Sequence, residues 1–429
     1  MKFDSIKAKI ADKVPKQNVS DTTYITALDI GTEFVKVLIA KNTDEGIEII
    51  GVGRKRQRLS DMHSGAISDI AGVVDTCDQA LQDAEDMTDE SVDSRNAAIG
   101  IAGELVYGAT TTLTYKRPDS SKEIAIPELT SIMQKVQDRA FARAQAQLSW
   151  ESGKKDIEIR QVNSALVSLM IDGYKVNNPV GFQGTDMSFQ LYSAFAPMVH
   201  ISALEKTADE LDLQLVAITA EPFAVARAVT PNEANTTFSA IMIDVGGGTT
   251  DIAVVNEGGV QGTRMFGIGG RSFTHTIATE LDVDFEKAEK LKLSLAQQAT
   301  GPDAKKLQNA IASTLDVWLS GIQVALEDFD TVDHLPAKIL LCGGGSSLKP
   351  LVRALQNDPW WKELPFTKQP VIHHIAPEEV FGVRDSTKKV TDHTFVTAMG
   401  LLVAARDTLD TSGDDDKKMT DRLNKLLQI

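Results

Sequence analysis

Short apolar runs alternate with polar turns along the first part of the chain. Tyr24–Asp29, Phe34–Ala40 and Ile47–Val52 are such runs, and apolar residues recur at helical spacing across Asp69–Ala84. Short apolar runs rich in β-branched residues predict strands, whereas a period of 3.6 residues predicts a helix. We therefore expect this part of the chain to fold as strand–strand–strand–helix.

A second pair of strands is predicted in the middle of the chain, at Ala240–Ile243 and Ile252–Val255. Both hairpins share one arrangement, in which a strand ends in an aspartate, a Gly/Thr turn follows, and the chain returns as a strand. In the first hairpin the residues of this arrangement are Asp29, Gly31 and Thr32. In the second hairpin they are Asp244, Gly246, Gly247, Gly248, Thr249 and a further carboxylate, Asp251.

These turns have the chemistry of a phosphate site. Glycines let successive backbone N–H groups approach an anion closely, and a carboxylate beside them suits Mg²⁺ or a water molecule near it. For either turn alone, an ordinary glycine-rich hairpin is the alternative. The repetition favours two similar subdomains that face each other across a phosphate chain.

Other segments add possible parts of the same site. Residues 95–200 contain strands and a helix in the pattern of a small α+β module. A helix is predicted around Thr274–Leu281, shortly after Gly270, and the next helix carries Glu289 and Lys292 one turn apart. A buried strand farther along ends in a third glycine turn, made of Gly343, Gly344 and Gly345.

The two ends of the chain have amphipathic patterns. Residues 1–16 place apolar side chains at helical spacing among lysines, which predicts a short basic helix that contacts either a membrane or the protein body. A polar linker, 411–418, leads to the segment 419–429, which is too short to fold alone in water. One predicted face of this last segment is apolar and consists of Met419, Leu423, Leu426 and Leu427. This face needs a membrane interface or another protein.

The overall composition narrows the class of protein. A chain of 429 residues can form several cores, and 42% hydrophobic with 24% charged residues is typical of a soluble globular protein. The two cysteines, Cys77 and Cys342, indicate neither a disulfide framework nor a metal site. A net charge of −16 argues against nucleic-acid binding. With no apolar run long enough to span a bilayer and no signal-peptide pattern, we expect a cytoplasmic protein.

The three glycine turns together resemble the two phosphate motifs and the adenosine motif of the actin/Hsp70/sugar-kinase ATPase superfamily. Within it, residues 171–184 of the inserted module, and the linker with its C-terminal amphipathic helix, resemble the FtsA family of bacterial division proteins. Residues 221–224 and 269–289 also resemble the related PilM family of type IV pilus assembly. The long tail favours the FtsA family, whereas the lysine-rich N-terminal arm is typical of neither.

The resemblance implies ATP and Mg²⁺ as ligands and assigns roles. Asp29 and Asp244 would flank Mg²⁺ and contact it through water, with hydroxyl contacts from Thr32 and Thr249. Glu221 would orient the attacking water, although a glutamate before proline is also common at a helix start. The ribose and adenine side would involve Gly270, Glu289, Lys292, Gly344 and Gly345. A Glu–Lys pair at this spacing is common on any helix, so Glu289 and Lys292 could equally be structural.

The expected fold class is α/β, a duplicated two-lobed actin/Hsp70-like ATPase fold with an inserted FtsA/PilM-type module. The first lobe is expected at 22–94, 201–232 and 385–410, with the module at 95–200. The second lobe is expected at 233–266 and 336–384, with a helical nucleotide-side subdomain at 267–335. The terminal parts are the basic arm 1–21, the linker 411–418 and the amphipathic helix 419–429.

The implied function is an ATP-binding division protein with at most slow ATP hydrolysis. It would polymerise on the cytoplasmic face of the cell membrane through the C-terminal helix, and would link the tubulin-like protein FtsZ to the envelope. The inserted module would bind other division proteins. One alternative is a PilM-like scaffold that binds a peptide of a membrane partner. Another is an active sugar kinase or chaperone, which the inserted module and tail disfavour.

Overall fold

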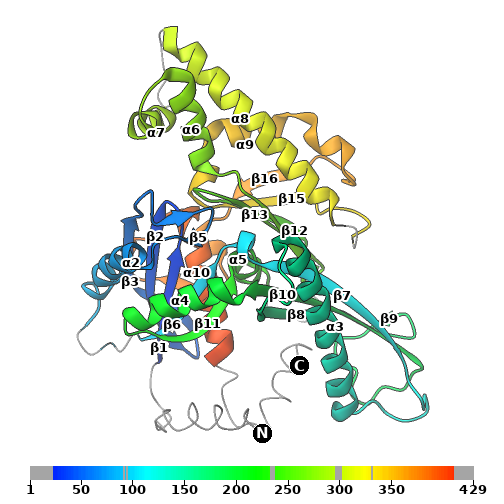
Figure 1. Ribbon diagram of the computed structural model, residues 1–429. Helices are drawn as coiled ribbons and strands as arrows, with labels where there is room; N and C mark the ends of the chain where they lie inside the picture. The colour runs from blue at the N-terminus through cyan, green and yellow to red at the C-terminus, as the bar shows by residue number, and fades with distance from the viewer. Residues whose placement is uncertain are drawn as a thin grey trace.

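The computed structural model describes residues 23–409, except for 90–91, 93–94, 232–236, 295–301 and 330–331. The predicted N-terminal arm, the linker and the C-terminal amphipathic helix lie outside the described residues. Two lobes stand one above the other in Figure 1, and a third body extends to the side of the lower lobe.

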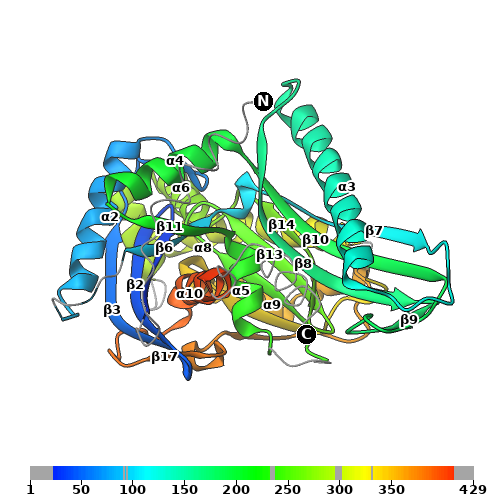
Figure 2. The ribbon, with the colours of Figure 1, turned by 90° about the horizontal axis from the view of Figure 1, so that it is seen from below.

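The first lobe is built on a six-stranded sheet with the strand order β11–β6–β1–β2–β3–β17. Its strands are β1 (Thr23–Ile30), β2 (Phe34–Thr43), β3 (Gly46–Arg56), β6 (Asn96–Ile101), β11 (Gln214–Ala220) and β17 (Val383–Asp385). Strands β1, β2 and β3 are antiparallel neighbours, as the pattern of three apolar runs predicted, and β6 joins β1 in parallel. Figure 2 shows α2 (Ile70–Glu85) and α10 (Val396–Leu409) on the two sides of this sheet.

The second lobe repeats the same topology. Its sheet has the order β14–β13–β12–β15–β16, so an antiparallel three-stranded meander is again extended by parallel strands beside its first member. Its strands are β12 (Ala240–Val245), β13 (Thr250–Asn256), β14 (Gly259–Phe266), β15 (Lys338–Cys342) and β16 (Val371–His374). The adjacent histidines His373 and His374 are the last two residues of β16.

Four helices lie above the second sheet in Figure 1: α6 (Gly270–Leu281), α7 (Phe285–Ser294), α8 (Pro302–Glu327) and α9 (Lys349–Asn357). The indole of Trp318 on α8 is fully buried, and its Nε1 donates a hydrogen bond of 2.9 Å to Thr250 Oγ1 on β13. This bond satisfies the polar atom of a large core side chain. The long helix is thereby fixed on the sheet beside the second glycine turn.

The inserted module forms a separate four-stranded sheet, ordered β7–β10–β8–β9, with its own helix. Its elements are β7 (Tyr107–Lys116), α3 (Ile126–Ser152), β8 (Ile159–Ile171), β9 (Tyr174–Lys175) and β10 (Asp186–Pro197). Tyr192 of β10 is hydrogen-bonded to Thr263 of β14 at 3.0 Å, and Thr110 of β7 donates to the Gln261 carbonyl at 2.5 Å. The module therefore contacts the edge strand of the second lobe.

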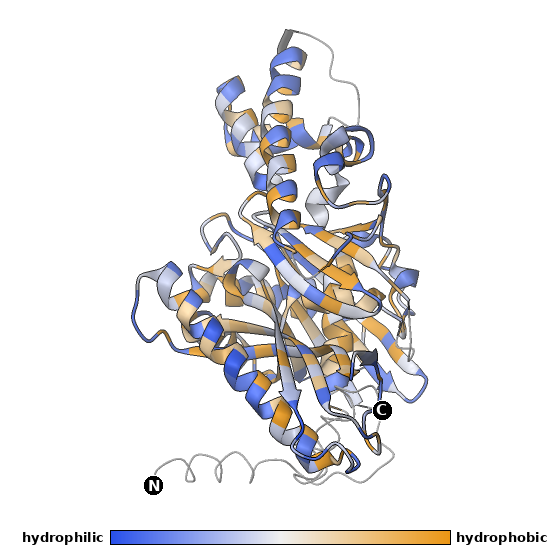
Figure 3. Ribbon diagram, turned by 90° about the vertical axis from the view of Figure 1, so that its right-hand side faces the viewer, coloured by the Kyte–Doolittle hydropathy of each residue, from blue (hydrophilic) through white to orange (hydrophobic). Residues whose placement is uncertain are grey.

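Short elements connect these parts. They are β4 (Met62–His63), β5 (Ala66–Ile67), η2 (Gly103–Leu105), α4 (Met198–Glu210), α5 (Glu221–Val229), η3 (Gly344–Ser347), η4 (Pro359–Glu363), η5 (Pro377–Glu379) and η6 (His393–Phe395). Apolar residues concentrate on the strands, while the outer faces of the helices are hydrophilic (Figure 3). None of the helices within the described ranges combines the length and hydropathy that crossing a bilayer requires.

Two glycines on β3 allow helix α2 to pack closely against the first sheet. A Cβ atom at Gly53 would lie 1.7 Å from the Ala80 carbonyl oxygen, and one at Gly51 would lie 2.3 Å from the Ala84 carbonyl oxygen. Both obstacles are helix backbone, which cannot rotate away as a side chain can. The separation of helix and sheet is therefore set by the missing side chains.

We expect Gly53→Ala to destabilise the protein by about 1–3 kcal/mol, because α2 must move away from β3 to accommodate the new methyl group. The urea midpoint of unfolding, followed by circular dichroism, measures this change. Gly267→Ala is the matched control, because a Cβ atom there would meet nothing within 4 Å. Equal midpoints for the two variants would contradict the packing argument.

Candidate functional site

The two glycine turns of the hairpins lie in contact, although more than 200 residues separate them in the sequence. A Cβ atom on Gly247 would lie 2.9 Å from Glu33 Cβ, and one on Gly248 would lie 3.1 Å from Thr32 Oγ1. Both turns are closed by the same kind of bond, from the Gly31 N–H to the Phe34 carbonyl and from the Gly246 N–H to the Thr249 carbonyl. The two similar turns therefore face each other, while the phosphate chain expected between them stays a prediction.

Helix α6 starts directly on the second turn. The Gly270 N–H donates to the Gly246 carbonyl at 2.9 Å, and the Arg271 N–H donates to the Gly247 carbonyl at 2.7 Å. The first N–H groups of a helix have no partner within it, and here the turn supplies the acceptors. The sequence predicted a helix from about Thr274. Helix α6 instead begins at Gly270, because the turn supplies these acceptors.

The carboxylate of Asp29 is paired with a lysine that the sequence analysis missed. Lys36 Nζ lies 2.7 Å from Asp29 Oδ2, and both side chains are buried. The register of β1 and β2 places these two residues directly opposite each other. Burial alone would lower the pKa of Lys36, but the charges of Asp29, Asp244 and Glu221 raise it above its ordinary value.

In the second hairpin an aspartate occupies the position that corresponds to Lys36. Asp244 lies opposite Asp251 in the register of β12 and β13. Burial raises the pKa of Asp251 to about 8, with a further contribution from the charge of Asp244. Thr249 Oγ1 donates to Asp251 Oδ2 at 3.1 Å, while Asp251 Oδ1 has no hydrogen-bond partner among the described residues. A buried oxygen without a partner is costly unless a proton, water or cation reaches it.

Asp244 is held from the other lobe. Thr397 Oγ1, on α10, donates to Asp244 Oδ2 at 2.6 Å. Burial raises the pKa of Asp244, although this hydrogen bond and the charge of Lys36 act in the opposite direction. The orientation of the carboxylate is therefore set by a helix that packs on the first sheet.

Two further carboxylates lie close by. Glu221 is the first residue of α5, the helix-start position that the sequence also allowed. It also lies near the three aspartates, whose charges act on it. Burial, followed by the charges of Asp29 and Asp251, raises the pKa of Glu221 well above its ordinary value. Burial also raises the pKa of Glu104 to about 7. The site therefore has a surplus of negative charge that Lys36 only partly offsets.

The third glycine turn meets the first residue of α6. A Cβ atom on Gly270 would lie 3.9 Å from Gly345 Cα and 3.5 Å from Lys292 Nζ, while one on Gly345 would lie 2.8 Å from the Gly246 carbonyl oxygen. A Cβ atom on Gly344 would meet nothing within 4 Å. Backbone therefore lines this side of the site and leaves open space beside Gly344.

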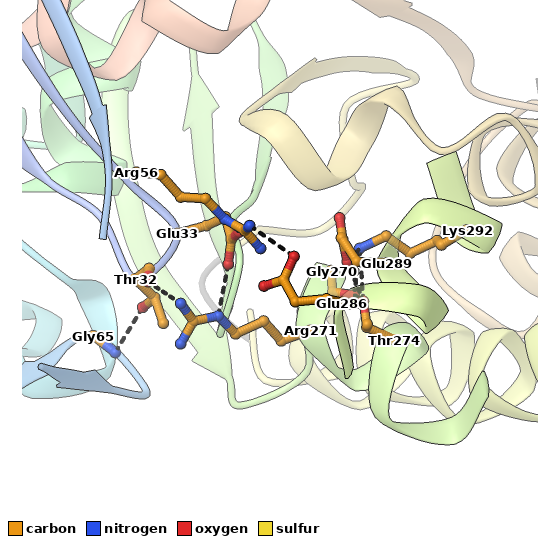
Figure 4. A network of polar contacts seen from close by, with 10 residues as sticks. All are labelled: Thr32, Glu33, Arg56, Gly65, Gly270, Arg271, Thr274, Glu286, Glu289 and Lys292. Atoms are coloured by element: carbon orange, nitrogen blue, oxygen red, sulfur yellow. Dashed lines mark hydrogen bonds and ion pairs between the residues drawn. The ribbon is translucent and has the colours of Figure 1, made fainter. Parts of the chain in front are cut away.

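Glu289 and Lys292 are bound to each other and to α6. Lys292 Nζ lies 2.8 Å from Glu289 Oε2 and donates to the Gly270 carbonyl at 2.9 Å, and Thr274 Oγ1 donates to Glu289 Oε2 at 2.5 Å (Figure 4). The pair lies beside the third turn, where the resemblance places the ribose and adenine. A nucleotide bound there would have to replace some of these internal hydrogen bonds. Direct contact of Glu289 and Lys292 with a nucleotide therefore stays a prediction.

The polar groups of this site suit an anion that brings its own counter-ion better than a metal ion bound by protein side chains alone. Across the described ranges, no three His, Cys, Asp or Glu side chains are arranged to hold a metal ion. The glycine turns provide backbone N–H groups, and the carboxylates provide acceptors for cation-bound water. These residues fit a phosphate chain accompanied by Mg²⁺.

Sequence reasoning found the glycine turns but missed side chains that arrive from elsewhere. Lys36 could have been found, because pairing the two predicted strands across the turn places it opposite Asp29. Thr397 and Glu104 carried no local signal, since each reaches the site only through the packing of a distant element.

Comparison with known proteins identifies relatives of the chain. The family described as "Cell division protein FtsA" matches residues 241–400. FtsA of Neisseria meningitidis serogroup B is 25% identical over 405 residues, with 89% of this chain and 90% of the relative covered. FtsA of Bacillus subtilis is 26% identical over 406 residues, covering 90% of this chain and 84% of the relative.

One solved structure, titled "PilM-PilN type IV pilus biogenesis complex", has a similar fold. Its TM-score is 0.65 at 15% identity, and the match covers 90% of this chain and 98% of that one. The chain is similar to FtsA proteins in sequence and to this solved structure in fold. The predicted duplicated fold with an inserted α+β module is thereby confirmed, and the identity to FtsA extends over almost the whole chain.

We expect the FtsA relative to lose stability as the pH rises, in part because of Asp251. Burial holds the pKa of this carboxyl at about 8 in the folded protein, against an ordinary value of 3.8. Between these values the folded state keeps a proton that the unfolded state has released, so stability falls with increasing pH. The urea midpoint should fall less steeply in Asp251→Asn than in the wild type, whereas the exposed Asp44→Asn should follow the wild type. Parallel curves for wild type and Asp251→Asn would contradict this assignment.

We expect Lys36→Met to destabilise the protein by about 3–5 kcal/mol, because Asp29 is then left buried without its partner. The double variant Asp29→Asn/Lys36→Met should recover part of this loss, since no uncompensated charge remains. Urea unfolding measures both effects. Lys206→Met, at an exposed ion pair with Glu210, should not change the midpoint measurably. A double variant as unstable as the single one would show that charge pairing is not the cause.

Proposed function

We propose that the protein is an ATP-binding cell-division protein that assembles on the cytoplasmic face of the membrane and tethers the FtsZ ring. The observation that carries the proposal is the contact between two glycine turns, one from each lobe, beside a group of buried carboxylates. Relatives described as cell-division proteins, similar over about nine tenths of the chain, support the division role.

The nucleotide site uses the residues predicted from the sequence. Bound ATP would supply a negatively charged triphosphate with Mg²⁺ as its counter-ion. Backbone N–H groups of the first two glycine turns would hold the phosphates, with hydroxyl contacts from Thr32 and Thr249. Asp29, together with Asp244, would hold the cation through water, and Asp251 lies in the same group of carboxylates.

Hydrolysis would be slow. Glu221 would hold the attacking water, because a carboxylate is a hydrogen-bond acceptor suited to that position. Its raised pKa leaves it protonated over more of the pH range than an ordinary glutamate, which makes it a weaker acceptor. The main consequence of ATP binding would be to hold the two lobes together, because each lobe contributes one turn to the site. The protein in this closed form would be the one that polymerises.

Attachment to the membrane would depend on residues 419–429. Their apolar face suits an interface helix, and the polar linker before it would let the body stand away from the surface. Other division proteins would bind the inserted module. The strongly acidic composition does not suit nucleic-acid binding.

Co-sedimentation with anionic liposomes, with and without Mg·ATP, tests the proposal. We expect the full chain to pellet, more strongly with Mg·ATP, and a chain ending at residue 411 to stay in solution. Leu426→Glu should also abolish pelleting, because it places a charge on the apolar face. Gln428→Glu is the matched control, since it adds the same charge on the opposite face of the predicted helix and should pellet nearly as the wild type does.

Two outcomes would overturn parts of the proposal. If ATP binds but no variant pellets, the tail docks on a protein, and a PilM-like scaffold becomes the better description. If Mg·ATP neither binds nor changes pelleting, the glycine turns are structural hairpins.

A further inference from the structure

Arg271 connects the two glycine turns. Its backbone N–H donates to the Gly247 carbonyl in the second turn, at 2.7 Å. Its side chain crosses to the first turn, where Nη2 donates to the Thr32 carbonyl at 2.6 Å and Nε lies 2.8 Å from Glu33 Oε2 (Figure 4). One residue therefore bonds to both turns.

The contact continues into a row of alternating charges. Glu33 Oε1 also accepts from Arg56 Nε at 2.8 Å, and Arg56 Nη1 lies 3.1 Å from Glu286 Oε2. Glu33 and Arg56 belong to the β1–β2 turn and to β3, whereas Arg271 and Glu286 belong to α6 and α7. Every charge in the row thus pairs with one of opposite sign, and two of the three ion pairs join different lobes (Figure 4).

The inner pair dominates the row. The side chains of Arg271 and Glu33 are 12% and 19% exposed, whereas those of Arg56 and Glu286 are 41% and 54% exposed. Ion pairs in water are screened by salt and contribute little, while partly buried charge-assisted hydrogen bonds contribute more. The bonds of Arg271 should therefore account for most of the effect.

We propose that Arg271 is a positioning residue that sets the spacing of the two glycine turns and holds the lobes together over the site, with Glu33 as its anchor. Backbone bonds fix the start of α6 to the second turn, so the turns can separate only if the side-chain bonds of Arg271 break. The inference deepens the proposed function, because the ligand retained between the turns is the nucleotide proposed above.

The spacing of the lobes is measurable without nucleotide. Spin labels on Gln79→Cys of α2 and Gln308→Cys of α8 report the distance between the lobes by electron–electron resonance. Both positions are exposed, and the native Cys77 and Cys342 are buried and protected from labelling. In the full chain we expect a single narrow distance distribution at low salt, and a broader one with longer distances in Arg271→Gln. High salt should widen the distribution of the unsubstituted chain more than that of Arg271→Gln, because the variant lacks the inner ion pair and keeps only the exposed Arg56–Glu286 pair between the lobes.

Release of a fluorescent ATP analogue provides the second readout. We expect Arg271→Gln and Glu33→Gln each to speed dissociation about tenfold, because each removes charge-assisted hydrogen bonds between the lobes. The double variant should be no faster than Arg271→Gln alone, since that substitution already removes the Arg271–Glu33 contact. Arg271→Lys retains the charge but loses the forked guanidinium donor. Its dissociation rate should therefore lie between those of the unsubstituted chain and Arg271→Gln.

Arg384→Gln is the matched control, because Arg384 pairs with Glu48 within the first lobe at 3.2 Å. It should leave both readouts unchanged. A distance distribution and salt response in Arg271→Gln equal to those of the unsubstituted chain would overturn the proposal. If the unsubstituted chain does not bind the ATP analogue, the proposed function fails, while the nucleotide-free distances still decide the role of Arg271.

Discussion

The contact between the first glycine turn and the side-chain-free glycines of the second is the constraint on which the rest of the structure depends. A Cβ atom would lie 2.9 Å from Glu33 Cβ at Gly247 and 3.1 Å from Thr32 Oγ1 at Gly248, so the missing side chains of the second turn let the lobes approach there. The same turn offers the Gly246 and Gly247 carbonyls to the start of α6. The helical part of the second lobe is thus attached to the one segment that also touches the first lobe.

The duplication of the fold creates this contact but does not make the two hairpins equivalent. Each has an aspartate at the end of its first strand, yet the residue opposite is Lys36 in one and Asp251 in the other. The first hairpin therefore pairs its aspartate with a cation, whereas the second places two carboxyl groups opposite each other. This asymmetry concentrates the demand for a proton or cation at Asp244 and Asp251, where α10 also contributes Thr397.

The inserted module and the helical part both contact the second sheet, the module at β14 and the helices at β13. The module leaves the first lobe through η2, which carries Glu104, and then contacts β14 through Tyr192. The helical part contacts the first lobe through Arg271 and Glu286. A change in the spacing of the turns would therefore move the helical part relative to the first lobe.

Local pattern was enough to predict the strands, the hairpins and the three glycine turns, because these depend on residues close together in the chain. The N-cap position of Asp69 and the positions of Asp29 and Asp244, each one residue before the end of its strand, follow from such short-range preferences. Repetition of one motif also predicted the duplicated lobes, before any contact between them was known.

Tertiary structure alone decided which side chains complete the site. Thr397 reaches Asp244 across 153 positions, and Arg271 reaches Glu33 across 238, and neither pairing has a local signature. The start of α6 at Gly270 likewise depends on acceptors in another loop. Burial, which raises the pKa of Glu221 and Asp251, is a property of the assembled lobes. The sequence by itself determined the elements and the glycine turns, because backbone propensity is local, while the charges and bonds between lobes arise only when distant segments pack.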